Sequence, residues 1–152
     1  MDRKYNTNII RYSKFATILF ILIVAVADIF GWVISKYIYT FWTDQKGDGA
    51  LILLTVVFYL GTVGAYGILF NVYRLLSNMD KDIVFDKVNT GLMFNIVAAL
   101  IGIAVVCIPG SYAWLGSSCL SILALFMALI VMCVKVVFDK AIDMKNDLDL
   151  TI

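Results

Sequence analysis

Four long apolar stretches dominate the pattern of hydrophobic and polar positions along the chain. They cover residues 15–35, 50–73, 91–109 and 118–138. Each is close to the roughly 20 residues that a helix needs to cross the hydrocarbon core of a bilayer. Because backbone N–H and C=O groups find no water at that depth, stretches of this length are expected to be helical. The strict alternation of a β-barrel strand is missing, for example in Phe20–Val24. The pattern predicts an all-α integral membrane protein with four transmembrane helices in a single domain.

The composition agrees with a membrane protein. Hydrophobic residues make up 62% of the 152 residues and charged residues 15%, whereas soluble domains have about 45–50% and about 25%. This excludes a soluble globular domain and an intrinsically disordered chain. A net charge of +1 gives no overall field that would attract nucleic acid, so direct nucleic-acid binding is not expected.

The first stretch allows a second interpretation. A basic N-terminal region followed by apolar residues and Ala25-Val26-Ala27 also describes a secretory signal with its cleavage site. However, the apolar run continues past Asp28 to Ile34 and is longer than a signal core. A first transmembrane helix is therefore the favoured interpretation.

The basic residues predict how the chain is oriented. With four spans, both termini and the loop 75–90 lie on one side, together with ten of the 12 lysines and arginines. Only Lys36 and Lys46 lie on the other side. The positive-inside rule then places the termini, the loop 75–90 and the tail 139–152 in the cytoplasm. Short connections favour an up-down antiparallel four-helix bundle.

The residue types restrict the chemistry. The chain contains no histidine and no glutamate, and its three cysteines form no C-x-x-C pair. An imidazole-based metal site and a nucleophile activated by histidine are therefore excluded. We expect no metal, no cofactor and no enzymatic activity.

Asp28 is the one ionisable residue well inside a span, where a charged side chain is costly and is by default a candidate for function. Hydroxyl groups at similar depth that could donate a hydrogen bond to it belong to Thr55, Tyr59, Thr62 and Ser121. The group could be a site for coupling a proton or cation. Alternatively, a hydrogen-bonded Asp28 fixes the register of the helices, which is the interpretation that we favour.

Small residues recur in the second span at Gly61, Gly64 and Gly67. Such residues let helix backbones approach closely in lipid. We expect close helix packing here, within one chain or in a homo-oligomer, rather than a groove for a substrate.

Cys107 and Cys119 lie near the outer ends of the third and fourth spans. An oxidising compartment could join them in a disulfide. Free thiols that pack as small apolar residues are the favoured alternative.

The segment Lys135–Lys145 keeps its apolar residues near one helical face, so we expect the fourth helix to continue beyond the membrane as an amphipathic extension. Lys135 and Asp139 are spaced for an i,i+4 ion pair. The extension is either a solvated helix end or a docking face.

Two short segments resemble a known family. Val84-Phe85-Asp86-Lys87-Val88-Asn89 is similar to a Phe-Thr-x-Glu-Asn stretch, and the C-terminal Lys145–Ile152 resembles an ending of the type Glu-Asn-Asp-Leu-Thr-Ile. Both are typical of an uncharacterised bacterial four-span membrane family catalogued as domain of unknown function 2975. The resemblance implies a protein of the bacterial cytoplasmic membrane from a family without an established biochemical activity. Members commonly lie beside small helix-turn-helix regulators, which suggests a membrane-anchored regulatory partner.

These features favour a non-enzymatic interaction or regulatory protein that binds a cytoplasmic regulator or a membrane complex. The expected partner-binding residues lie in the loop and the tail: Phe85, Asp86, Asn89, Asn146, Asp147, Thr151 and Ile152. The alternative is a small transporter, efflux or immunity protein that uses Asp28 for coupling.

Overall fold

The computed structural model describes residues 2–42 and 47–150 of the chain, with side chains for residues 8–42 and 47–148. Five helices follow one another in this part: α1 (Asp2–Ile29), α2 (Gly31–Trp42), α3 (Asp48–Asp80), α4 (Lys87–Gly110) and α5 (Gly116–Leu150). Four of them, α1, α3, α4 and α5, are long and apolar enough to cross a membrane. The predictions of an all-α chain and of four candidate membrane helices are confirmed.

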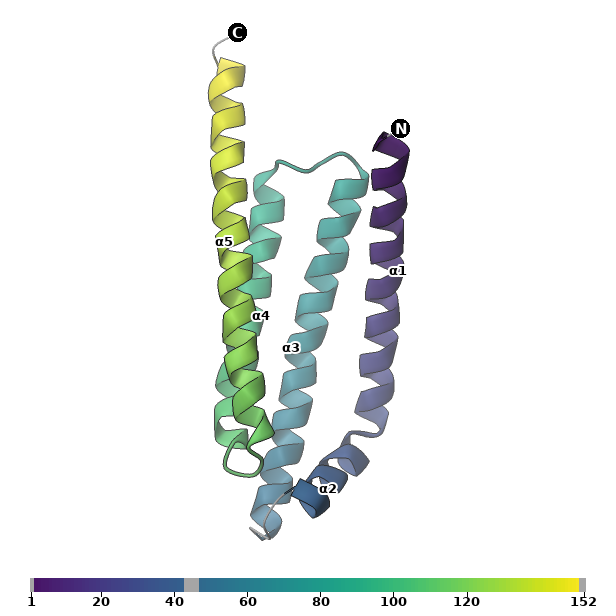
Figure 1. Cartoon of the computed structure of the whole chain (residues 1–152), viewed down its shortest axis with the longest axis vertical. Coiled ribbons are helices and arrows are strands. Elements are labelled where there is room, and N and C mark those ends of the chain that lie inside the picture. Colours follow the sequence, from purple (N-terminus) through teal and green to yellow (C-terminus); the bar gives the residue numbers. More distant parts are fainter. Residues whose placement is uncertain (1, 43–46, 151–152) are drawn as a thin grey trace.

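The four long helices run roughly along the long axis of the molecule (Figure 1). The beginning of α1, the α3–α4 connection and the last turns of α5 lie towards one end, which we call the terminal end. α2 and the α4–α5 connection lie at the opposite end (Figure 1). α3 has 33 residues and α5 has 35. At about 1.5 Å per residue both helices exceed the roughly 30 Å hydrocarbon core. The predicted extension of the fourth apolar helix is confirmed, because α5 continues without a break to Leu150.

The helices form an open row rather than a closed bundle. Close backbone contacts join α1 to α3, α3 to α4 and α4 to α5, while α2 packs against α3 and the end of α1. In the described ranges, no Cα atom of α5 comes within 8 Å of a Cα atom of α1 or α3. α4 lies between two long neighbours and buries residues at helical spacing, among them Met93, Ile96 and Ala104.

The first predicted span is divided in the structure. The apolar run 15–35 does not form one helix, because α1 ends at Ile29 and α2 begins at Gly31. The hydroxyl of Tyr59 on α3 donates a hydrogen bond to the backbone carbonyl oxygen of Asp28 at 3.2 Å. In a continuous helix, this oxygen would instead accept a hydrogen bond from a backbone N–H group of the same helix. Gly31 allows the close approach of α2 to α3. A Cβ atom at this position would lie 2.8 Å from both Phe58 and Tyr59.

The predicted close packing of small residues is confirmed at Gly64. A Cβ atom there would lie 2.5 Å from Cγ1 of Ile103 on α4. Gly67 faces Ala99 at an ordinary contact distance, whereas a Cβ atom at Gly61 would meet no atom within 4 Å. The three glycines therefore have different surroundings, and of the three only Gly64 makes a contact with α4 that a Cβ atom would obstruct.

Candidate functional site

Asp28 lies in the last turn of α1, partly buried against α3. Its Oδ2 accepts a hydrogen bond of 2.8 Å from the hydroxyl of Tyr66. Its Oδ1 is buried and has no hydrogen-bond partner among the described residues. One oxygen of this carboxyl group is thus bound by α3, while the other has no hydrogen-bond partner in the described part of the chain.

The hydroxyls proposed from the sequence do not bind this carboxyl group. Thr55 and Thr62 donate to carbonyl oxygens of their own helix, at Leu51 and Tyr59. Ser121 on α5 donates to the carbonyl oxygen of Ala104 at 2.8 Å, which joins α5 to α4.

Tyr59 and Tyr66 are the two residues of α3 that reach Asp28. Tyr59 binds its backbone carbonyl and Tyr66 its side chain. Tyr66 was not among the partners predicted for Asp28. Residues seven apart lie on the same face of a helix, so its spacing from Tyr59 could have indicated it. The intramembrane polar group is therefore Asp28 with Tyr59 and Tyr66.

An apolar cavity of about 470 Å³ lies beside this group, between the helices. It is lined by residues of all five helices, including Ala27 of α1 and Thr62 of α3, but Asp28 and Tyr66 do not line it. The carboxyl group thus sits at the α1–α3 contact, outside the wall of the cavity.

Asn89 organises the connection between α3 and α4 at the terminal end. Its side chain is fully buried, with 0% exposure. Its amide nitrogen donates to the carbonyl oxygens of Ile83 and Val84 at 2.7 and 2.8 Å, and its amide oxygen accepts from Asn78 at 2.8 Å. Asn89 therefore shapes the loop from inside and offers no surface to a partner, which corrects its expected role as a direct binding residue.

Two further residues determine the local conformation of the loop. The Asp86 carboxylate accepts a hydrogen bond from the backbone N–H of Val88 at 2.8 Å and so caps the first turn of α4. Asp82 has a φ of 59°, in the left-handed region that Asp tolerates better than most residues. The segment that resembles the family motif is therefore an N-cap followed by a buried amide.

α5 packs onto this loop. The rings of Phe85 and Phe138 lie 5.9 Å apart between centroids, and Ile142 is only 4% exposed. A groove between the two elements is lined by Asp82–Asp86 of the loop and by Lys145 of α5. Loop and extension thus form one continuous surface.

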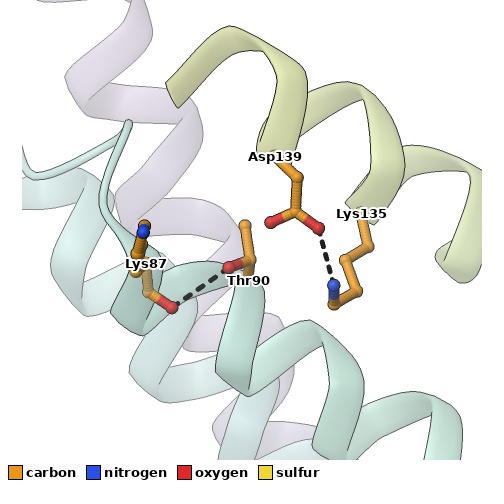
Figure 2. A network of polar contacts seen from close by, with 4 residues as sticks. All are labelled: Lys87, Thr90, Lys135 and Asp139. Carbon is orange, nitrogen blue, oxygen red and sulfur yellow. Dashed lines mark hydrogen bonds and ion pairs between the residues drawn. The ribbon is translucent and has the colours of Figure 1, made fainter. Parts of the chain in front are cut away.

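A polar cluster lies next to this surface, where α4 and α5 are in contact (Figure 2). Lys135 donates to Asp139 at 2.6 Å, which confirms the predicted i,i+4 pair. Figure 2 shows Asp139 facing Thr90, whose hydroxyl donates to the carbonyl oxygen of Lys87 at 3.1 Å. Asp139 follows the apolar part of α5, and its hydrogen bond with Lys135 holds the pKa of the carboxyl below its usual value.

A second ion pair joins α1 to α3 at the terminal end. Lys14 donates to Asp80 at 2.7 Å. Asp80 lies seven residues beyond the apolar run 50–73, and the hydrogen bond from Lys14 lowers the pKa of its carboxyl.

The remaining predicted partner residues lie at the end of the chain. Asn146 and Asp147 are exposed on α5. Phe85 is half exposed and Asp86 is exposed in the loop. Thr151 and Ile152 lie outside the described residues.

The three cysteines all lie in described helices and are free thiols. Cys107 is buried and Cys119 is exposed, so the structure corresponds to the alternative without a Cys107–Cys119 disulfide. Among the residues with described positions, no three acidic, histidine or cysteine side chains gather as a metal site would require.

Comparison with known proteins identifies a family but no characterised relative. No curated protein and no solved structure matches the chain. Residues 12–152 match the family described as "Protein of unknown function (DUF2975)". This match spans nearly the whole chain, including all five helices for most of their length, so the chain belongs to the DUF2975 family of proteins of unknown function.

Proposed function

We infer that the protein crosses the cytoplasmic membrane of a bacterium four times, as an open up-down antiparallel row of helices with both termini in the cytoplasm. The distribution of ten basic residues on one side against two on the other supports this orientation. The terminal end then faces the cytoplasm, and its two ion pairs lie near water and the lipid headgroups. The aromatic helix α2 lies at the surface of this membrane that faces away from the cytoplasm.

The proposed function is that of a non-enzymatic interaction or regulatory protein. The observation that carries it is the packing of α5 onto the α3–α4 loop through Phe85, Phe138 and Ile142. This contact combines two segments far apart in the sequence into one surface at the terminal end. Half-exposed Phe85 and exposed Met144 and Leu148 give that surface an apolar component. Exposed apolar residues outside the lipid are typical of protein interaction sites.

Site-directed photocrosslinking in cells tests this function. A photoreactive phenylalanine analogue is placed at Asp86 in the loop, at Asn146 in α5, and at Phe94 on α4 as a control. Phe94 is 55% exposed and belongs to the apolar run 91–109. We expect the loop and α5 positions to form an adduct with the same cytoplasmic or membrane protein, and the Phe94 position not to do so. Adducts with unrelated proteins, or no adduct at Asp86 and Asn146, would contradict the proposal.

A small transporter is the second candidate function, because Asp28 has a buried oxygen without a partner among the described residues. Unsatisfied ionisable groups inside a membrane are typical of sites that couple protons or cations. It ranks second because Asp28 does not line the cavity. If the protein exports a toxic compound, Asp28→Asn should abolish resistance while the protein still reaches the membrane. Unchanged resistance in this variant would exclude the coupling role.

A further inference from the structure

The apolar cavity extends along the helices, in the direction of the membrane normal. Its walls run from Ser35, Leu54 and Trp114 near the opposite end to Ala65 and Met127 nearer the middle of the helices. Leu54 and Ala65 are eleven residues apart on α3, which corresponds to about 16 Å along the helix. This is about half of the roughly 30 Å hydrocarbon thickness of a bilayer. The cavity therefore has the length of one membrane leaflet.

The chemistry of the walls excludes water as the natural occupant. A buried water molecule needs two to four polar partners, but the walls are apolar apart from a few hydroxyl groups. Of these, Thr62 already donates to the carbonyl oxygen of Tyr59. An empty apolar space would leave the lining side chains without dispersion contacts. The cavity is therefore suited to a hydrocarbon, and its volume of about 470 Å³ lies in the range of about 300–1,000 Å³ that is usual for ligand pockets.

One polar atom at the outer end of the cavity is unsatisfied. Ser35 on α2 lines the cavity and is 1% exposed, and its Oγ has no hydrogen-bond partner in the described part of the chain. A buried hydroxyl group without a partner is costly. A ligand with a hydrocarbon chain and a polar group at one end would satisfy both the walls and Ser35.

The open side of the helix row provides a route for such a ligand. The walls on either side belong to α1 and α5, whose backbones do not approach each other in the ranges described. In a bilayer, this side is surrounded by lipid. We propose that the cavity binds one acyl chain of a membrane lipid, with the ester group at Ser35 and the end of the chain near Ala65 and Met127.

Fluorescence quenching at Trp114 tests the proposal. Trp114 lines the cavity, and Trp32→Phe with Trp42→Phe leaves it as the single tryptophan of the three in the chain. This parent protein is reconstituted in vesicles of phosphatidylcholine that carries two bromine atoms on one chain, on carbons near the ester group, because Trp114 lies at the Ser35 end of the cavity. Bromine quenches tryptophan fluorescence on contact, so we expect strong quenching relative to vesicles of unbrominated phosphatidylcholine.

Two glycine substitutions distinguish quenching by a bound chain from quenching by the surrounding lipid. Gly61 lines the cavity and a Cβ atom there meets no atom within 4 Å, so Gly61→Leu should fill the cavity without a clash. Gly102 on α4 is equally free of contacts but is exposed and does not line the cavity, so Gly102→Leu is the matched control. We expect Gly61→Leu to lower the quenching about twofold or more, since a filled cavity loses its contact with the chain. The fluorescence of Gly102→Leu should be quenched as strongly as that of the parent.

Equal quenching in the parent and in Gly61→Leu would overturn the proposal. Quenching by a free brominated fatty acid but not by the brominated lipid would also overturn it, because the source would then not be a membrane lipid. If Gly61→Leu does not reach the membrane, Ala124→Leu fills the cavity from the α5 wall and gives the same test. Native mass spectrometry supplies a second readout. The parent should retain phospholipid after extraction, and Ser35→Ala should retain less.

Discussion

The two ends of the molecule are held together in different ways. At the terminal end, directional polar contacts hold the helices and their connection: Lys14 on α1 binds Asp80 on α3, and the amide of Asn89 binds the α3–α4 loop. Within α5, Lys135 binds Asp139, which faces Thr90 of α4 (Figure 2). At the opposite end, apolar packing dominates: Ala50, Leu54 and Ala113 form a buried cluster beside the apolar cavity, and Gly31 allows the close approach of α2 to α3. Hydrogen bonds from Tyr59 to Asp28 and from Ser121 to Ala104 add to this packing.

This difference follows from the solvent at each level. Hydrophobic association does not favour contacts between helices inside lipid, so shape complementarity decides where backbones touch. Where a helix leaves the lipid, hydrogen bonds can fix the position of loops and helix ends. A terminal end held by hydrogen bonds, together with an apolar half that contains a cavity, suits the proposed interaction surface at the terminal end and the proposed lipid chain in the apolar half.

The largest effect is expected at Asn89. Asn89→Ala removes the donor for two loop carbonyl groups and the acceptor for Asn78. Buried groups left without partners cost about 1–3 kcal/mol each, so we expect a loss of roughly 3 kcal/mol in the free energy of unfolding. Thermal unfolding in detergent, together with faster proteolysis in the α3–α4 loop, measures it. Asn95→Ala, at an exposed position of the same helix, should be nearly neutral. Similar losses in both variants would contradict the role of Asn89 as the centre of the loop.

The next effect concerns packing in the apolar half. Gly64→Ala places a Cβ atom 2.5 Å from Cγ1 of Ile103, so we expect it to destabilise the protein by about 1–2 kcal/mol. Gly61→Ala meets no neighbour and should be neutral or slightly stabilising, because alanine favours the helix. Ile103→Ala should make Gly64→Ala less damaging in a double-mutant cycle measured by thermal unfolding. Additive effects would show that the α3–α4 contact does not depend on Gly64.

The sequence predicted what the bilayer alone imposes. The four apolar helices follow from the length of their runs, and the Lys135–Asp139 pair follows from helical spacing. The break at Phe30 was not predicted, because the apolar run continues through it, and the hydroxyl group that binds the Asp28 carbonyl there comes from Tyr59 in a distant segment.

The same limit applies to the candidate sites. Depth in the membrane suggested several hydroxyl partners for Asp28, but depth does not specify the helix face, and the structure selects Tyr66. Asn89 belongs to a polar connection that is expected to be solvated. Its burial results from the way the loop folds back over the first turn of α4.

A smaller effect is expected at the polar group inside the membrane. Tyr66→Phe removes the hydrogen bond to Asp28, and such bonds between membrane helices contribute about 0.6 kcal/mol on average. Tyr73→Phe is the matched control, since Tyr73 lies on the same helix without a hydrogen bond to Asp28. A thermal shift between the two variants, measured in the same lipid and detergent mixture, reports the difference. Equal stability would mean that α1 is held against α3 by packing alone.

The smallest effect is expected at the ion pair between α1 and α3, because exposed pairs contribute little to stability. The hydrogen bond from Lys14 lowers the pKa of Asp80 below its ordinary 3.8 in the folded protein. The contribution of the pair is therefore present above the unfolded pKa and is lost as the pH falls through the lower folded pKa. Between about pH 5 and about pH 2, the melting temperature of the parent should fall more than that of Lys14→Met, which has no pair to lose. Lys140→Met, at an exposed position of α5, should follow the parent. If the Lys14→Met curve runs parallel to the parent curve, the terminal end is held by the amide of Asn89 and the α4–α5 contacts, without help from Lys14.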